Sequence, residues 1–355
     1  MSSVLDLARP DLVALRPYEP GAWEPGMTRL NANESAWRLP SDPTVRGLNV
    51  YPPPRPTELR EALAGYYGTQ SGSVLVTRGS SEAIDVLIRG FCRAGQDSIL
   101  VTPPSFDMYR VYATIQAANI QSAPLARSDG FTFDLDGLLA AIDETTRIVF
   151  VCSPNNPTGT VIDPGDLVRL AEALENRALL VVDAAYQEYA EDQGLDALLE
   201  RFEHVVVLRT LSKFVALAGA RCGALIARPV VVGFLENVLP PYTFPTPSIE
   251  IVLAAMAPES LAVASQRIEE TRAERNRLSQ ALAGLENVLE VYSSQANFVL
   301  IRLNDKRQFV EAAHRGGVLV RSFSGDPALA DCVRITIGLP ADNTRLLESV
   351  AEGVS

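Results

Sequence analysis

The chain has few histidines and cysteines, and this shortage argues against a structural metal site. Among its 355 residues are two histidines and four cysteines, and the sequence contains no closely spaced cysteine pair. A structural metal site needs several clustered ligands of these kinds, so none is expected. The cysteines lie in apolar settings and are expected to be reduced, buried thiols; they are Cys92, Cys152, Cys222 and Cys332.

The chain also lacks excess positive charge and long apolar runs. Its formal net charge is −12, which argues against DNA or RNA as a partner. Its apolar runs, such as "VVVL" at 205–208, are far shorter than the roughly 20 residues that span a bilayer. The first residues show no basic segment followed by an apolar core. We therefore expect a cytoplasmic protein with no nucleic-acid or membrane partner.

Lysine is nearly absent, which draws attention to the two that remain. Lysines and arginines together number 31, and only Lys213 and Lys306 are lysines. Arginine supplies positive charge but stays protonated, whereas a lysine amine can lose its proton and act as a nucleophile. Lys306 lies in the polar stretch "NDKRQ", while Lys213 stands between a serine and an apolar segment. The sequence therefore predicts that Lys213 forms a Schiff base.

Short apolar runs alternate with amphipathic stretches from about residue 60 to 230, which predicts an α/β fold. The expected strands cover 73–77, 98–102, 147–152, 178–183, 205–210 and 222–227. Helical patterns such as 81–95 and 163–176 lie between them. Such strands favour a mainly parallel sheet covered by helices on both faces, with ligands at the carboxyl ends of the strands.

The rest of the chain predicts a smaller α+β domain and an extended arm. A proline-rich break at 239–250 precedes a long amphipathic stretch at 260–285. Strand-like runs follow at 297–303, 317–323 and 332–338. The expected division is an N-terminal arm (1–45), a large domain (46–255) and a small domain (256–355).

Polar residues follow several predicted strands. Ser80 and Ser81 open a helix after a strand, where free backbone N–H groups favour phosphate, although an ordinary helix cap has the same pattern. Asn156 lies in "SPNNPTG", which suits either rigid amide donors or a plain turn. Asp183 ends an apolar strand, with Tyr186 three residues on, and reads as a paired buried carboxylate or as a helix cap.

Together these residues match the requirements of one cofactor. Pyridoxal 5′-phosphate needs an amine for its aldehyde, a carboxylate for its ring nitrogen, donors for its phenolic oxygen and N–H or hydroxyl groups for its phosphate. Lys213, Asp183, Asn156, Tyr186 and the Ser80 turn would supply that set.

Long motifs carry a resemblance to a known family. "SPNNPTG", "VVDAAY" and "LRTLSKFVALAGARCG" resemble the class I/II aminotransferases of fold type I, and more closely the histidinol-phosphate aminotransferases. So do "LRPYEPG", "LNANES", "VYPPPRPTELREALA", "VTRGSSEAIDVLIRGFC", "TPPSFDMY" and "CVRITIG". The resemblance covers nearly the whole chain and implies a large domain with a seven-stranded sheet. It also implies a homodimer and an N-terminal arm that contributes to the small domain and to the dimer contact.

The resemblance also implies roles for the matching residues. Lys213 would hold the cofactor and move the proton, Asp183 would pair with the ring nitrogen, and Asn156 and Tyr186 would bind the ring oxygen. The cofactor phosphate would contact Ser80, Ser81, Thr210, Ser212 and Arg221. It would also contact Tyr51 of the partner subunit. Phe106 would lie over the ring. The substrates would contact Tyr18, Asn33, Arg321 and Arg334, although Arg334 alone also reads as a strand residue paired with a surface carboxylate.

Four departures from the family pattern bear on the substrate. Ala184 replaces a glutamate, and Phe106 replaces a tyrosine. After the lysine, the family has a small residue followed by an aromatic one, and Phe214 and Val215 reverse this order. The segment between "NANES" and Tyr51 is short. The expected reaction is transamination of L-histidinol phosphate with 2-oxoglutarate, which gives imidazole-acetol phosphate and L-glutamate. An aromatic amino-acid aminotransferase and a decarboxylase of threonine phosphate are the alternatives.

Overall fold

The larger part of the chain is built round a seven-stranded sheet. A computed structural model describes residues 3–16, 18, 21–22, 24 and 27–352. The strands are β1 (Val74–Thr77), β2 (Ser98–Val101), β3 (Asn119–Ser122), β4 (Thr146–Cys152), β5 (Leu179–Asp183), β6 (Val205–Thr210) and β7 (Gly223–Ile226). Their order is β1-β7-β6-β5-β4-β2-β3, and β7 alone runs antiparallel to its neighbours. The predicted α/β fold with a mainly parallel sheet is confirmed, and the carboxyl ends of the six other strands share one edge.

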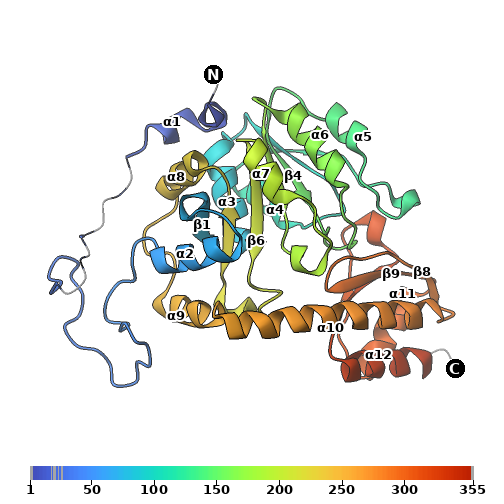
Figure 1. Ribbon diagram of the computed structural model, residues 1–355. Helices are drawn as coiled ribbons and strands as arrows, with labels where there is room; N and C mark the ends of the chain where they lie inside the picture. The colour runs from blue at the N-terminus through green and yellow to red at the C-terminus, as the bar shows by residue number, and fades with distance from the viewer. Residues whose placement is uncertain (1–2, 17, 19–20, 23, 25–26, 353–355) are drawn as a thin grey trace.

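Helices cover both faces of this sheet (Figure 1). They are α2 (Thr57–Tyr66), α3 (Ser80–Phe91), α4 (Met108–Ile115), α5 (Leu135–Ala140), α6 (Pro164–Leu174), α7 (Leu195–Arg201), α8 (Pro229–Val238) and α9 (Thr246–Ala255). Alternate residues of β5 enter two hydrophobic clusters: Leu180 and Val182 pack in one, Leu179 and Val181 in the other. Because both faces of the strand are buried, its sequence is continuously apolar rather than alternating.

The edge strand β3 was not predicted from the sequence. Its residues "NIQS" are polar at both ends and only half-buried in the middle. An edge strand has one hydrogen-bonded neighbour and an open side, so it needs no apolar run.

A four-stranded antiparallel sheet forms the smaller domain. Its strands are β8 (Val288–Val291), β9 (Phe298–Leu303), β10 (Arg321–Ser322) and β11 (Cys332–Thr336), in the order β10-β11-β9-β8, with α11 (Lys306–Arg315) and α12 (Pro340–Glu352) packed on it. The strand predicted over 317–323 is shorter than expected. At the sheet edge it pairs only Arg321 with Arg334 and Ser322 with Val333.

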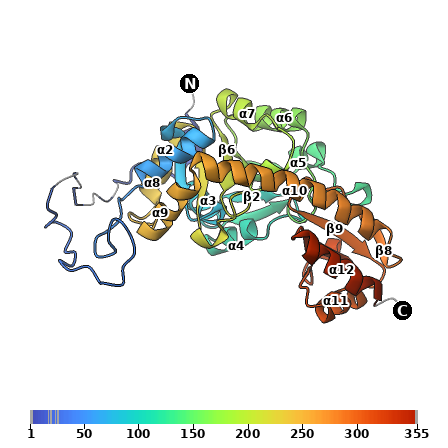
Figure 2. The ribbon, with the colours of Figure 1, turned by 60° about the horizontal axis from the view of Figure 1, so that its bottom comes forward.

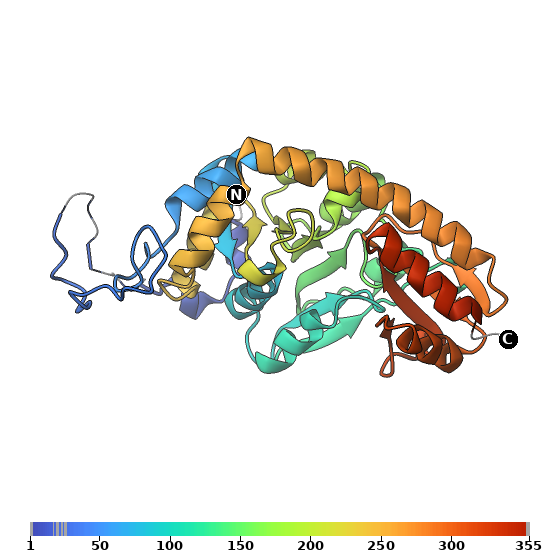
Figure 3. The same ribbon diagram turned by 90° about the horizontal axis from the view of Figure 1, so that it is seen from below.

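Helix α10 (Pro258–Ala283) joins the two domains and runs along both (Figures 2 and 3). Ala264 and Ile268 in its first half pack in the core of the large domain. Leu278 and Leu282 in its second half pack in the core of the small domain. The helix therefore belongs to both cores, and the division near residue 256 stays a prediction.

The N-terminal residues first dock on the large domain and then leave it. A 3-10 helix (Val4–Leu7) and α1 (Pro10–Val13) come first, and Val4 and Ala8 are buried in the cluster that holds α3 and α8. Residues 27–50 extend away from the body in Figures 1 and 2. The start of the arm therefore packs on the large domain, and a contribution of the arm to the small domain and to a dimer contact stays a prediction.

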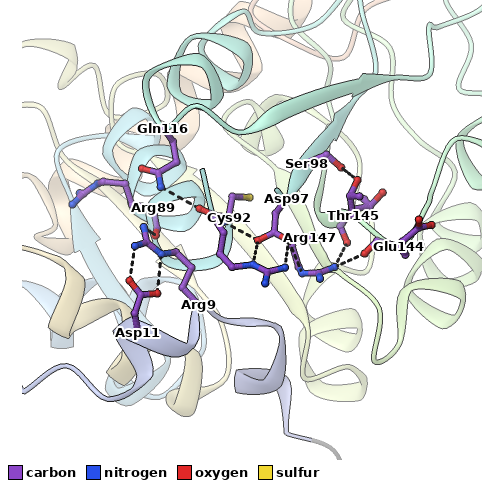
Figure 4. Close-up of polar contacts among 12 residues, drawn as sticks. Arg9, Asp11, Arg89, Cys92, Asp97, Ser98, Gln116, Glu144, Thr145 and Arg147 are labelled. Carbon is purple, nitrogen blue, oxygen red and sulfur yellow. Dashed lines mark hydrogen bonds and ion pairs between the residues drawn. The ribbon is translucent and has the colours of Figure 1, made fainter. Parts of the chain in front are cut away.

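Polar contacts hold the N-terminal segment on α3, and a separate group links the starts of β2 and β4 at the amino edge of the sheet (Figure 4). Arg9 pairs with Asp11 and donates to the carbonyl oxygen of Arg89 at 3.1 Å. Asp97, which precedes β2, accepts from Arg93 at 2.7 Å and lies 3.4 Å from Arg147 at the start of β4. Burial alone would raise the pKa of Asp97, but the donors from Arg93 and the charge of Arg147 lower it.

A cavity of about 670 Å³ opens at the same amino edge, lined by Asp6, Leu7, Ile142, Asp143, Glu144, Arg147, Asn176 and Arg177. It lies away from the carboxyl ends of the strands, where α/β sheets bind their ligands.

No single described helix is long and apolar enough to cross a bilayer, and α9 and α10 meet that criterion only as a pair bent by 72°.

Candidate active site

The strand-end residues predicted from the sequence share one edge of the large sheet. Asp183 ends β5, and its neighbour in register on β4 is Cys152. Thr210 ends the adjacent strand β6, and Ser212 and Lys213 follow in the next turn. Parallel strands thus bring together residues that are far apart in the sequence.

Asp183 is a buried carboxylate held by two neutral donors. Its side chain is 2% exposed, Oδ2 accepts from the Tyr109 hydroxyl at 2.8 Å, and Oδ1 accepts from the Ala185 amide at 3.2 Å. Burial raises the pKa of this carboxyl to about 6, while Tyr109, Ala185 and the charge of Lys213 oppose the shift. Sequence reasoning missed Tyr109, because nothing in "PPSFDMY" announces a contact with a residue 74 positions away.

The Lys213 amine is poised to lose its proton. Its Nζ lies 5.7 Å from the centroid of the Tyr186 ring. Burial lowers the pKa of Lys213, and the nearby charges of Arg334 and Arg221 lower it further, against the opposing charge of Asp183. A neutral amine is the nucleophilic form, so the environment favours the chemistry that the sequence suggested.

Asn156 links the large domain to Arg334 of the small one. Its Nδ2 donates to the Tyr186 hydroxyl at 3.4 Å, and its Oδ1 accepts from Arg334. Burial raises the pKa of Tyr186, which therefore stays a phenol. The chain accordingly carries a line of polar groups from the end of β4 to β11.

Arg334 is half-buried without a counter-charge. Its Nε is buried and unpartnered, and its guanidinium lies 5.2 Å from the Phe298 ring. Among the residues that the structure describes, no carboxylate forms an ion pair with it, so the alternative of a surface pair is not supported. Arg321 lies opposite it in register and is exposed.

Donors converge between β6 and the start of α3. Thr210 Oγ1 donates to Ser212 Oγ at 3.0 Å, and Arg221 Nη1 donates to the same Oγ at 3.4 Å. Gly79 precedes α3, and no side chain caps the helix, so its first-turn N–H groups at Ser80 and Ser81 remain available. These groups form a cup suited to an anion.

The absence of a side chain at Gly79 lets Arg221 lie close to the backbone of this cup. The backbone of Gly79 has φ +77°, and a Cβ built there would lie 2.7 Å from Nη2 of Arg221. The same Nη2 donates to the carbonyl oxygen of Arg78 at 3.4 Å. A side chain at residue 79 would therefore push Arg221 away.

The predicted aromatic and arm residues fall into two groups. Phe106 is half-buried and meets the edge of the Tyr109 ring, with centroids 5.8 Å apart. Tyr18, Asn33 and Tyr51 are exposed on the arm, and no described contact joins them to Lys213. Tyr51 instead stacks on Tyr242 at 4.7 Å, beside a cavity of about 440 Å³ that Asn33 also lines.

Two of the departures from the family pattern have structural counterparts. Ala184 is fully buried, so a glutamate would not fit its site without a partner. Phe214 stacks on Tyr66 of α2, with centroids 5.1 Å apart, and so anchors the turn that carries Lys213. The aromatic ring displaced by one position therefore packs under the lysine turn.

The geometry suits one cofactor. An amine with a lowered pKa can add to an aldehyde, a buried carboxylate can hold a protonated ring nitrogen, and the cup at Gly79 has donors for a phosphate. On a mainly parallel seven-stranded sheet, this combination defines the fold-type I class of enzymes that depend on pyridoxal 5′-phosphate.

Comparisons with known proteins identify the family. The model of the family described as aminotransferase class I and II matches residues 39–350, and the chain belongs to this family. A histidinol-phosphate aminotransferase of Xanthomonas euvesicatoria pv. vesicatoria is 43% identical over 353 residues, which are 98% of this chain and 97% of the relative.

Solved structures agree on the fold. The histidinol-phosphate aminotransferase of Clostridium acetobutylicum superposes with a TM-score of 0.79 at 20% identity and covers 87% of this chain and 91% of its own. That of Sinorhizobium meliloti, solved in complex with pyridoxal 5′-phosphate, gives a TM-score of 0.76 at 23% identity, with 86% and 83% covered.

Proposed function

We propose that this chain exchanges an amino group between L-histidinol phosphate and 2-oxoglutarate, with pyridoxal 5′-phosphate as its cofactor. The products are imidazole-acetol phosphate and L-glutamate, as in histidine biosynthesis. The relative at 43% identity over nearly the whole chain supports this reaction. We propose a cytoplasmic location with it, since the four cysteines are buried and free.

The observation that carries the proposal is the uncompensated charge of Arg334. A half-buried guanidinium without a carboxylate is unfavourable unless an anion binds beside it. Arg321 faces it across the β10–β11 pair. Two guanidinium groups suit a phosphate dianion, and one of them suits the carboxylate of glutamate, so both half-reactions can use the same place.

Lys213 would carry the proton. The bound cofactor withdraws electrons from the carbon that bears the substrate's amino group, which makes its C–H bond acidic. Lys213 Nζ, in its neutral form, takes that proton and returns it to complete the amino transfer. Burial and the charges of Arg334 and Arg221 lower the pKa of this amine, which favours the neutral form that the task needs.

The other residues would bind and orient the cofactor. Asp183 holds the positive charge at the ring nitrogen, and Asn156 and Tyr186 bind the ring oxygen. Asn156 donates to the Tyr186 oxygen, which leaves the hydroxyl hydrogen of Tyr186 free to donate to that ring oxygen. The phosphate is bound by the cup of Ser80, Ser81, Thr210, Ser212 and Arg221, and Phe106 lies over the ring.

A homodimer belongs to the proposal. Tyr51 is 51% exposed on an arm that leaves the body, and Leu30, Trp37 and Val45 of the arm are 92%, 83% and 87% exposed. Exposed apolar groups of this size are typical of an interface. We propose that a second copy of the chain covers them and receives Tyr51 at its phosphate cup, with Tyr18 and Asn33 lining the substrate side.

The first experiment follows single half-reactions. The purified protein, loaded with cofactor, is mixed separately with histidinol phosphate, glutamate, phenylalanine and threonine phosphate, and its visible absorbance is recorded in a stopped-flow instrument. We expect rapid loss of the visible band with the first two compounds and little change with phenylalanine.

The other outcomes separate the alternatives. Faster bleaching by phenylalanine would reassign the chain to aromatic amino acids, with Phe106 as the first residue to test. Release of carbon dioxide from threonine phosphate would point to a decarboxylase. A protein that takes up no cofactor and shows no visible band would overturn the proposal.

A further inference from the structure

Tyr109 of α4 holds the carboxylate of Asp183 from behind. Its side chain is 1% exposed and its hydroxyl lies 2.8 Å from Asp183 Oδ2. The ring is clamped, because it stacks on Phe150 of β4 at 4.8 Å with planes 11° apart and meets the edge of Phe106 at 5.8 Å. The packing fixes the position of the hydroxyl oxygen beside Asp183.

The carboxylate has few other partners. Oδ1 accepts from the Ala185 amide at 3.2 Å, and no arginine, lysine or histidine of the described chain forms an ion pair with it. An ionised carboxylate offers about four lone-pair positions, and these two donors occupy two. Positions remain on both oxygens for a third donor.

The groups that face Asp183 come from two secondary-structure elements and two turns. They are Tyr109 from α4, Cys152 from β4, Tyr186 from the turn after β5, and Lys213 from the turn after β6. The Cys152 thiol donates to the carbonyl oxygen of Pro154 at 3.3 Å, and burial raises its pKa, so it stays neutral. The hydroxyl of Tyr109 is the first of the contributions that lower the pKa of Asp183 against the effect of burial.

We propose that Tyr109 is a positioning residue that keeps Asp183 ionised and orients it toward the ring nitrogen of the cofactor. The inference rests on the proposed function, since it concerns the same bound group. Burial disfavours the charged carboxylate, and one hydrogen bond from a clamped phenol opposes this without introducing a second charge. The aromatic pair of Phe106 and Phe150 thereby serves the carboxylate through Tyr109.

The test compares Tyr109→Phe with a matched buried tyrosine. Tyr109→Phe keeps the ring and both aromatic contacts and removes only the hydroxyl. Tyr67→Phe is the control, because Tyr67 is buried, its hydroxyl has no partner, and it touches Arg209 rather than Asp183. The dissociation constant of pyridoxal 5′-phosphate from the apoprotein is measured by fluorescence between pH 5 and 9.

We expect Tyr109→Phe to weaken cofactor binding about 10-fold at pH 7, the low end for a hydrogen bond to a charged group. Removing the donor raises the pKa of Asp183, so the acid-side loss of affinity should begin at a higher pH. In an Asp183→Asn background, Tyr109→Phe should have no further effect, because the charge that it serves is gone. Tyr67→Phe should match the wild type in both affinity and pH dependence.

Unchanged affinity and pH dependence in soluble, folded Tyr109→Phe would show that Tyr109 contributes only packing. If that variant does not fold, 3-fluorotyrosine at position 109 gives the second test. It is a stronger donor of nearly the same size, so the acid-side loss of affinity should move to lower pH, and movement to higher pH or none would overturn the role. Failure of the wild type to bind the cofactor at all would instead contradict the proposed function.

Discussion

Lys213 illustrates how an environment selects one residue type. Burial and two guanidinium groups, those of Arg334 and Arg221, disfavour the protonated amine, whereas an arginine at this position would remain charged. A chain that uses arginine for nearly all its positive charge keeps lysine where a neutral amine is needed.

The amine of Lys213 should therefore react at lower pH than an ordinary lysine. Lys306 is the one reference in the same chain, with Nζ donating to the carbonyl oxygen of Phe323 at 3.0 Å. Pulse acetylation of the apoprotein from pH 6 to 10, read by mass spectrometry, should label Lys213 with an earlier midpoint. Arg334→Gln removes a nearby positive charge and should move that midpoint upward. Coincident titration of the two lysines would contradict the assignment.

The ionised carboxylate of Asp183 should destabilise the cofactor-free protein at neutral pH. Its pKa is raised from 3.8 to about 6, so the folded protein binds more protons than the unfolded chain between these values, and stability falls as pH rises through that window. The loss is about 3 kcal/mol. Asp183→Asn removes it, so the variant should be more stable than the wild type above pH 6 and similar near pH 4.

Chemical denaturation of both apoproteins at pH 4 and pH 8 measures this difference. The ionisable groups common to both proteins cancel in the comparison. A variant with the same stability difference at both pH values would show that Asp183 has an ordinary pKa.

At the scale of elements, the turn into α3 depends on Gly79. Its conformation, φ +77° and ψ 171°, belongs to a region that is nearly restricted to glycine. A methyl group there would also strike Arg221. We expect Gly79→Ala to weaken binding of pyridoxal 5′-phosphate at least about 10-fold, the scale of a lost charge-assisted hydrogen bond.

Gly95→Ala is the matched control for this prediction. Gly95 also has a positive φ, +68°, but a Cβ there would meet nothing within 4 Å. The control should lose about 1 kcal/mol of stability and keep its cofactor affinity. Equal affinities for the two variants would remove Gly79 from the phosphate cup.

The middle of α10 holds the turn that follows Tyr186. Arg272 donates to the carbonyl oxygens of Glu188 at 3.0 Å, Tyr189 at 3.2 Å and Ala190 at 2.9 Å. Arg272→Ala should cost about 2–3 kcal/mol, because partly buried acceptors lose a charged donor. Arg267→Ala, an exposed arginine of the same helix, should stay within about 0.5 kcal/mol of the wild type. Thermal unfolding of both variants checks the contrast.

At the scale of the whole molecule, the proposed dimer makes each site depend on two chains. Lys213→Ala removes the amine of one site, and Tyr51→Phe removes the hydroxyl that would reach the other chain's phosphate. Each homodimer should be impaired. A mixed dimer pairs an intact Lys213 with an intact Tyr51 at one of its two sites, so mixing should restore about half the activity per dimer.

Differently tagged chains, co-expressed and purified as the mixed species, provide the measurement. Absence of recovery in a verified mixed dimer would mean that Tyr51 serves the site of its own chain. A monomer in sedimentation experiments at micromolar concentration would contradict the proposed assembly.

The amino-acid sequence determined the fold class and most of the site's chemistry. Apolar periodicity and strand-end residues are local signals, so β4, β5 and β6 and the positions of Asp183 and Lys213 could be predicted from them. The edge strand β3 could not, because an edge strand needs little apolar sequence, and β10 is shorter than the run predicted over 317–323.

Only the tertiary structure decided which residues meet. The contact of Tyr109 with Asp183 and the lone charge of Arg334 beside Asn156 join positions 74 and 178 residues apart. The docking of the N-terminal helices on the large domain is of the same kind. Such contacts depend on how helices and sheets pack, and no local pattern encodes them, whereas the residue types that the chemistry requires are written in the chain itself.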